Sequence, residues 1–401
     1  MEIITHSNSS KLLLDRIIWF SFIVWLIIDD LTGFFINAGK PLPISQTFKF
    51  GLLIILIFRL STFKRQFIIL YSFLTYIAFI SLHLIFIDEN VPITLLHLSK
   101  LLLTVIIYLY FVKYIQISST QDFITKSNTI LYISFLIIAI NIGLGLFGIG
   151  YHTYPDEGIG YKGFFFAGNE MGGLLVVIFP YILYRTFIKY GHIRYCIMCT
   201  ICIALSILLG TKTVILISLL SSICVGWLYG SAKFRRNLIF SITIIVTVSL
   251  PYFINLINSR EVDILMRMSY SFDNGGLSSL IFSSRDEFWA KKSIEFFNSD
   301  AVTQMFGLGG NRSVEMDHLD SLLNYGYFGL TVIYGFFLYL LLHAIKHRHN
   351  NSYCPIIILT DILLISISLI AGHIIFSSMA GMYIALQNSL TNIKANQSIL
   401  I

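Results

Sequence analysis

Long apolar runs recur along the whole of this chain, and they restrict it to a fold built from membrane helices. A helix needs about 20 apolar residues to span a bilayer. Runs near that length occur twelve times, although the last two meet at Gly372-His373 and could count as one. The runs cover residues 17–37, 44–60, 67–87, 93–112, 129–149, 166–188, 193–210, 213–229, 237–257, 320–343, 355–371 and 373–390. The sequence therefore predicts an all-α, polytopic integral membrane protein with about twelve transmembrane helices.

The composition indicates the same class. Charged residues make up 12% of the 401 residues and hydrophobic residues 56%, whereas a soluble domain carries about 25% charged residues. The N-terminus is polar as far as Ser10, and the first apolar run is long enough to be retained, which predicts no cleaved signal peptide. There is no G-x-x-x-x-G-K-[ST] loop, and no G-x-G-x-x-G follows a predicted strand, so we expect no cytosolic nucleotide site.

The basic residues predict how the chain is oriented in the membrane. Sixteen of the 27 Lys and Arg fall in alternate connections, and the opposite short loops hold only Lys40, Lys162 and Lys212. Since cytoplasmic loops carry the excess of Lys and Arg, both termini are expected in the cytoplasm and residues 258–319 outside it. The chain then divides into an N-terminal bundle of about nine helices (1–257), a large outward loop bearing short helices (258–319) and C-terminal helices (320–401).

The outward loop holds the densest group of polar residues. Its six Lys and Arg against nine Asp and Glu exclude a general polyanion-binding surface. Ser284-x-x-Glu287 is a capping-box pattern that predicts a helix running through Phe297. Arg285, in the first turn, would lie beside free backbone N–H groups, which suits a phosphate or pyrophosphate. The alternative is an ordinary amphipathic helix with Arg285 paired to a carboxylate.

The same predicted helix mixes cations with aromatic rings. Phe288, Trp289, Lys292 and Phe296 share a face with Arg285 at helical spacing. That mixture favours a helix lying at the membrane surface with its rings among the lipid head groups.

A second group of candidate residues begins the span that follows the loop. A flexible turn, Gly307-Leu308-Gly309-Gly310, leads to Asp317-His318-Leu319-Asp320. We expect Asp317 to cap the helix. His318 can take a proton near neutral pH, and Asp320 can orient it or replace it as the base. The alternative for His318 is a hydrogen-bonding anchor at the membrane interface.

Other polar residues lie within the spans or at their ends. Carboxylates are costly in lipid, so Asp29, Asp30 and Asp361 are expected to face the bundle interior or water. Lys49 and Lys100 are near the outer ends of their spans, where snorkelling explains them.

Three more candidates lie where predicted spans begin on the outward side. Asn169 and Glu170 follow the run Gly163-Phe164-Phe165-Phe166 and could hydrogen-bond at the outer face. Lys212 lies between two spans on the same side.

Three motifs together resemble the bacterial O-antigen polymerase and O-antigen ligase superfamily. The first is Gly163…Asn169…Gly173 at the start of a helix, and the second is Arg285 ahead of an aromatic, basic helix. The third is Gly307-Leu308-Gly309, then His318, then Asn324-Tyr325-Gly326-Tyr327-Phe328-Gly329. The hydropathy outline is similar to the family's over nearly the whole chain.

The resemblance implies a glycosyltransferase that needs no metal or other cofactor. It would act on the periplasmic face of the bacterial inner membrane on glycans carried by undecaprenyl pyrophosphate, as both donor and acceptor. By position, Arg285 would hold the pyrophosphate and His318 would be the base. Lys212 stands where the family usually has arginine, and Leu319 stands where it often has asparagine.

From the residues themselves we expect Asp320 or Glu170 to assist His318 as the base. We also expect Lys212, Lys292, Asn169, Glu170 and Trp289 to contact the substrate. The lipid bilayer and a chain-length regulator are the expected partners, and nucleic acid is not one.

Three functions remain open on the sequence. An O-antigen polymerase would join lipid-linked repeat units, and it is our choice on the diversity of the family. A ligase would transfer the glycan to lipid A–core. A lipid-linked oligosaccharide flippase is the alternative from another class, and it predicts repeat symmetry and charges deep in the bundle. We find no internal repeat, and apart from Asp361 the notable polar residues lie toward one face.

Overall fold

The computed structural model describes residues 2–63, 91–155, 158–166, 168–240, 285–309 and 312–393, with Gly276, Phe282 and isolated residues between 70 and 85. The side chains of residues 2–11 and 91–95 and of Asn169 are not among those described. The predicted spans 67–87 and 237–257, Ser284 and most of the outward loop before it therefore fall largely outside the described residues.

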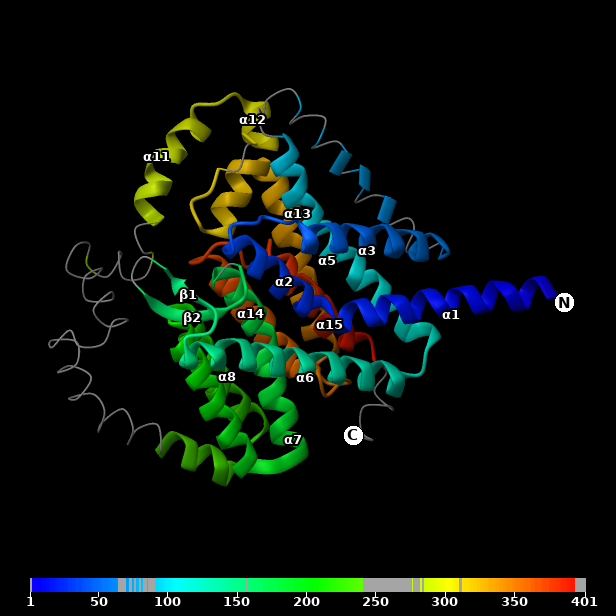
Figure 1. Cartoon of the computed structure of the whole chain (residues 1–401), viewed down its shortest axis with the longest axis vertical. Helices are drawn as coiled ribbons and strands as arrows, with labels where there is room; N and C mark the ends of the chain where they lie inside the picture. Colours follow the sequence, from blue (N-terminus) through cyan, green and yellow to red (C-terminus); the bar gives the residue numbers. More distant parts are fainter. Residues whose placement is uncertain are drawn as a thin grey trace.

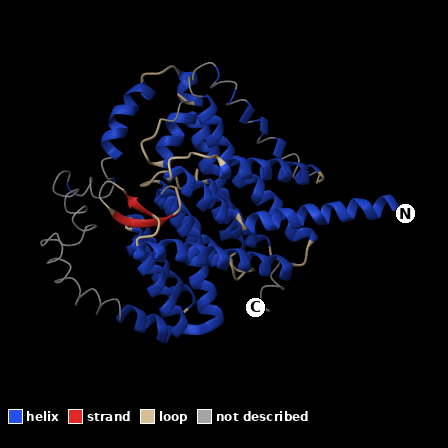
Figure 2. Cartoon of the chain, viewed as in Figure 1, coloured by secondary structure: helices blue, strands red, loops and turns tan. Residues whose placement is uncertain are grey.

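Helices make up nearly all of the described chain, as Figure 2 shows. In chain order the elements are α1 (Glu2–Ile23), α2 (Trp25–Asn37), α3 (Ile44–Ser61), α5 (Val91–Ile117), α6 (Thr120–Leu144), η1 (Gly145–Phe147), β1 (Tyr151–Tyr154), β2 (Ile159–Gly163), α7 (Gly168–Leu209), α8 (Lys212–Tyr229), α11 (Arg285–Phe297), α12 (Ala301–Phe306), α13 (Asp317–His347), α14 (Cys354–Ser368), α15 (Ser378–Ser389) and η2 (Leu390–Asn392).

Six of these helices are long and apolar enough to cross a membrane, counted over the described residues: α3, α5, α6, α7, α8 and α13. The shorter α14 is also apolar. The prediction of a helical membrane protein is confirmed at this level. The predicted number of twelve spans remains a prediction.

The predicted spans 166–188 and 193–210 form the two arms of α7. Gly191 has φ 77° and ψ −170°, which interrupts the helix between them. The Thr153 hydroxyl donates to the Leu209 carbonyl at 2.7 Å, and a Cβ built on Gly168 would lie 2.7 Å from Thr153 Cγ2. Because the first and last residues of α7 both lie beside Thr153, α7 folds back on itself.

The sequence analysis did not foresee the two strands. β1 and β2 pair antiparallel, with Tyr151 opposite Gly163, and they pack beside the start of α7 (Figure 1). Their residues, Tyr-His-Thr-Tyr and Ile-Gly-Tyr-Lys-Gly, lack a clear alternation of apolar and polar side chains, so the usual strand signal is absent. Burial lowers the pKa of the Lys162 ammonium in β2, which donates to the Phe166 carbonyl at 2.7 Å.

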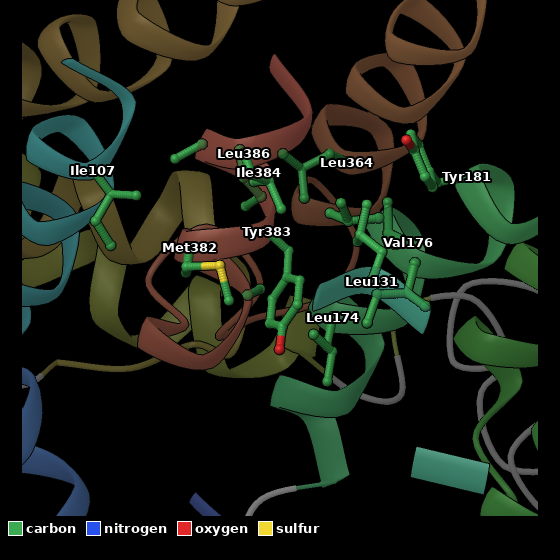
Figure 3. Close-up of a cluster of buried hydrophobic side chains, with 14 of the residues drawn as sticks. Ile107, Leu131, Leu174, Val176, Tyr181, Leu364, Met382, Tyr383, Ile384 and Leu386 are labelled. Carbon is green, nitrogen blue, oxygen red and sulfur yellow. The ribbon is translucent and has the colours of Figure 1, made fainter. Parts of the chain in front are cut away.

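The core is centred on α15, which lies among α2, α5, α6 and α7 (Figure 1). All of its residues from Met379 to Ser389 are buried. Met382, Tyr383, Ile384 and Leu386 lie among side chains of α5, α6, α7 and α14 (Figure 3). The Tyr383 hydroxyl shares a 2.7 Å hydrogen bond with Ser134 of α6. The sequence predicted this segment, 373–390, as a span, whereas α15 has 12 residues and no exposed face.

The connection between α14 and α15 is irregular. Residues 369–377, here called the α14–α15 connection, contain no α-helix, and His373 has a positive φ of 64°. Non-helical backbone inside a membrane bundle needs partners from elsewhere in the protein. Those partners come from α13 and are described with the site.

A glycine also breaks α13 near its start. Gly326 has φ 67° and ψ −171°, which separates residues 317–325 from 327–347. The predicted span 320–343 lies within α13, which is long and apolar enough to cross a membrane, but the break at Gly326 was not predicted. A Cβ on Gly326 would lie 2.4 Å from the Met305 backbone, so only glycine allows α12 and α13 to approach this closely (Figure 1).

We predict that Gly326→Ala destabilises the protein by about 2 kcal/mol or more, since alanine is strained at positive φ and overpacks the contact. Gly335→Ala in the same helix is the control, because no atom lies within 4 Å of its added Cβ and alanine favours helix. The melting temperatures of the purified variants in detergent measure both effects. Equal melting temperatures would contradict the break at Gly326.

Candidate functional site

The predicted loop helix and the start of α13 converge on the loop between them. α11 begins at Arg285 and ends at Phe297, as predicted. Lys292 donates to the Ser313 carbonyl at 3.0 Å. The Ser313 hydroxyl in turn donates to an Asp320 carboxylate oxygen at 3.3 Å. Two groups of residues predicted separately from the sequence therefore belong to one site.

Arg285 joins three parts of the chain. Its guanidinium lies 3.1 Å from the Glu315 carboxylate and donates to the Ile370 carbonyl at 3.0 Å. The Arg285 side chain is mostly covered, whereas that of Glu315 is 54% exposed. The structure therefore shows the alternative interpretation of Arg285, in which its guanidinium pairs with a carboxylate, here that of Glu315. A half-exposed pair of this kind is weak, so an anionic ligand can displace Glu315 at small cost.

Asp317 anchors the site, although it does not cap α13 as the sequence predicted. The N-cap is Met316, and it makes no side-chain cap bond. The buried Asp317 carboxylate instead accepts hydrogen bonds from the backbone N–H groups of His373, Ile374 and Ile375, at 2.6, 2.9 and 2.7 Å. These bonds hold the α14–α15 connection against the start of α13.

Asp320 helps to shape the same region. Its carboxylate accepts from the Val314 N–H at 2.5 Å and from Ser313. Asn324, one turn later, donates to the Arg312 carbonyl at 2.9 Å and accepts from the Arg312 N–H at 2.9 Å. The first turns of α13 therefore fix the loop that carries Ser313.

A small pocket opens between these elements, and we call it the site pocket. It is lined by His97, Ser313, Asp320, Asn324, Tyr325, His373 and Phe376. His97 comes from α5 and His373 from the α14–α15 connection. Imidazoles and carboxylates are common general bases, and this pocket holds two imidazoles and one carboxylate.

The sequence analysis missed both of these histidines. His97 lies one helical turn before Lys100 in a span that otherwise looked apolar. His373 is a polar residue at the junction of two predicted spans, which is a sign of a possible function. No role was predicted for it.

His318, the base chosen from the sequence, is absent from the site pocket. It lies two residues from Asp320, and at 3.6 residues per turn the two side chains leave α13 in nearly opposite directions. It is half-buried, and its Nδ1 atom has no hydrogen-bond partner among the described residues.

Ion pairs surround the pocket at the end of the bundle where α5, α7 and α13 begin, which we call the site end. Glu170 at the start of α7 lies 3.9 Å from Lys100, and the Ser377 hydroxyl donates to it at 3.3 Å. Nearby, Lys49 pairs with Asp29 at 2.6 Å, and it also donates to Ser378 at 3.2 Å.

The structure tests the predictions for the charged residues within the spans. Asp29 and Asp361 are 7% and 3% exposed, so the prediction that they face the interior is confirmed. Lys49 is 5% exposed, and snorkelling toward water was therefore the wrong explanation for it. Lys100 likewise turns toward Glu170.

The remaining predicted site residues lie around this cluster. Trp289 is half-buried and packs against a small core that includes Phe296 and Val314. Phe288 is 56% exposed, and so it does not share the buried face of α11. Lys212 begins α8 two residues before Val214, which lies with Ile374 beside Gly172. Lys212 is therefore at the site end, whereas the side chain of Asn169 is outside the described residues.

A larger cavity, of about 900 Å³, lies at the other end of α3 and α5. Both of its carboxylates are paired with cations: Asp15 with Arg59 at 2.9 Å, and Asp122 with Lys126 at 2.7 Å. No histidine is among its lining residues. This cavity is the larger of the two, but the site pocket is lined by two histidines and a carboxylate, which are the groups that acid–base chemistry uses.

Among the described residues, no cluster of three or more His, Cys, Asp or Glu side chains is placed to hold a metal ion. Comparisons with protein families, with curated proteins and with solved structures give no match for this chain. Only the geometry of the site end and the motif resemblance therefore bear on the function of this chain.

Proposed function

We propose that this chain is a membrane glycosyltransferase of the O-antigen polymerase type. It joins oligosaccharide repeat units carried on undecaprenyl pyrophosphate, at the periplasmic face of the bacterial inner membrane. In this proposal both termini are cytoplasmic and residues 258–319 are periplasmic. The supporting observation is the convergence of Arg285 and Lys292 of α11 with Asp320 and His373 at the site end.

The reaction needs a site for the departing pyrophosphate. Outside the cytoplasm there are no nucleotide sugars, so the sugar arrives already activated on lipid. The bond between the anomeric carbon and the pyrophosphate oxygen breaks, and the electron pair leaves with the pyrophosphate. Arg285 and Lys292 lie on one side of α11, since both contact the loop at 313–315. Charge-assisted hydrogen bonds from them would stabilise the growing negative charge.

The reaction also needs a base for the acceptor hydroxyl. As the acceptor oxygen bonds to the anomeric carbon, its proton must leave. His373 and Asp320 line the same pocket, and the positive φ of His373 is a backbone strain of the kind that collects at functional sites. We therefore assign the base to His373, oriented by Asp320, in place of His318.

The interrupted helices favour a second candidate, a lipid-linked oligosaccharide transporter. Transporters place substrates at discontinuous helices near mid-membrane, and both α13 and the α14–α15 connection are discontinuous. The polar residues that meet there lie at the ends of α5, α7 and α13, however, which suits surface chemistry better than passage through the bundle.

Deletion of the gene tests the proposal and separates the alternatives. We expect surface lipopolysaccharide to carry a single repeat unit in place of a ladder, because unpolymerised units still reach the core. Gel analysis of lipopolysaccharide from deleted and complemented cells gives the answer. Core without any repeat unit would instead indicate the ligase or the transporter, and it would overturn the polymerase.

Arg285→Ala should reduce polymer formation about 10- to 100-fold, since it removes charge-assisted contacts of about 1.5–3 kcal/mol. Lys291→Ala is the matched control, because Lys291 is an exposed cation on the same helix. Polymer length is compared at equal membrane levels of each variant.

Glu315→Ala tests whether Arg285 acts only as a structural link. We expect nearly normal polymer, because the pair with Glu315 is half-exposed. If Glu315→Ala is as damaging as Arg285→Ala, the pyrophosphate role of Arg285 is refuted.

The base is tested by two matched substitutions. Asparagine tolerates positive φ, so His373→Asn keeps the backbone of the α14–α15 connection while removing the imidazole. We expect it to lower polymerisation about 10²-fold or more, and His318→Asn to leave a ladder. The opposite pattern would return the role of base to His318.

A further inference from the structure

A carboxylate is buried halfway along α14. Asp361 is seven residues from either end of that helix (Cys354–Ser368), or about 10 Å at 1.5 Å per residue. It is 3% exposed, in a helix that is otherwise almost wholly apolar. The site pocket does not include it.

Asp361 and the adjacent Thr360 each contact one carboxamide of α15. Asn388 donates to one Asp361 oxygen at 2.9 Å, and Gln387 donates to the hydroxyl of the adjacent Thr360 at 3.0 Å. The second Asp361 oxygen and the carboxamide oxygens of Gln387 and Asn388 have no hydrogen-bond partner among the residues that the structure describes. All three of these buried, unpartnered atoms are acceptors, and Gln387 and Asn388 are 0% and 2% exposed.

No protein cation balances this carboxylate within the part of the chain that the structure describes. Two other buried acids have cations, since Asp29 pairs with Lys49 and Asp15 with Arg59. Asp317 and Asp320 accept hydrogen bonds from backbone N–H groups instead. Within the described residues, Asp361 has only the Asn388 amide. An ionised carboxylate without a counter-charge is very costly in a buried site, so a positive species from outside the protein is required.

We propose that Asp361, Asn388 and Gln387 bind one monovalent cation, with Na⁺ as the ion to test. Carboxylate and carbonyl oxygens are the ligands that hard cations prefer. One carboxylate neutralises a single positive charge, whereas a divalent ion would leave a buried excess. A protonated Asp361 has a single O–H donor and cannot serve both unpartnered carboxamide oxygens. The inference does not depend on the proposed function.

Thermal stability of the full-length protein in lipid nanodiscs tests the site. At equal ionic strength and pH 8, NaCl should raise the melting temperature by about 2 °C or more over choline chloride. The rise should saturate with Na⁺ concentration. Asp361→Asn, which has nearly the same shape, should abolish the rise, and Asp122→Asn at the half-exposed pair with Lys126 should retain it.

Direct binding of ²²Na⁺ to the wild-type protein gives a second readout that needs no variant. We expect about one ion per chain, displaced by unlabelled NaCl and not by choline chloride. The proposal is overturned if no ion binds. It is also overturned if the melting temperature changes with pH but is the same in every salt, and Asp361 then carries a proton. A Na⁺ effect that persists in Asp361→Asn overturns the assignment to this residue.

Discussion

The three hydrogen bonds to Asp317 are the interaction on which the site end depends. They satisfy consecutive backbone amides in a segment that is not helical. Asp317, Ile374 and Ile375 are at most 1% exposed, so water cannot replace these bonds. Hydrogen bonds to a charged group contribute about 1.5–3 kcal/mol each. With the connection held against α13, His373 and Asp320 line one pocket, and the Ile370 carbonyl is in place to accept from Arg285.

Much of the helical framework was predictable because a membrane helix satisfies its own backbone, whatever its neighbours are. The span predicted at 44–60 corresponds to α3, and the one at 213–229 to α8. The turn at Gly191 also falls between two predicted spans. The break at Gly326 was not predicted, because a glycine within an apolar run can either interrupt the helix or let two helices pack closely.

Only the parts of the site whose residues lie close together in the sequence were predictable. The sequence placed Arg285 and Lys292 on one helix and Asp320 at the start of another, and these do converge. It could not bring His97 and His373 to them, because that depends on how α5 and the α14–α15 connection pack against α13. It also assigned Asp317 to a local cap, whereas the partners of Asp317 come from more than fifty residues along the chain.

Buried charges are handled differently at the site end and in the middle of the bundle. Near the site pocket Asp29 pairs with Lys49 and Glu170 with Lys100, while Asp317 accepts three backbone N–H groups. At Asp361 the balance is missing among the described residues. The site end therefore suits the head group of an anionic lipid, whereas the position of Asp361 inside the bundle suits a small cation.

Reconstitution tests the central claim most directly. The purified protein in liposomes receives an undecaprenyl-pyrophosphate-linked repeat unit, with EDTA present to remove divalent ions. The account predicts joined repeat units and the release of one undecaprenyl pyrophosphate for each bond formed. The polymerase assignment is contradicted if the repeat units stay unjoined and no undecaprenyl pyrophosphate is released. Movement of the lipid between the two leaflets would then identify a transporter.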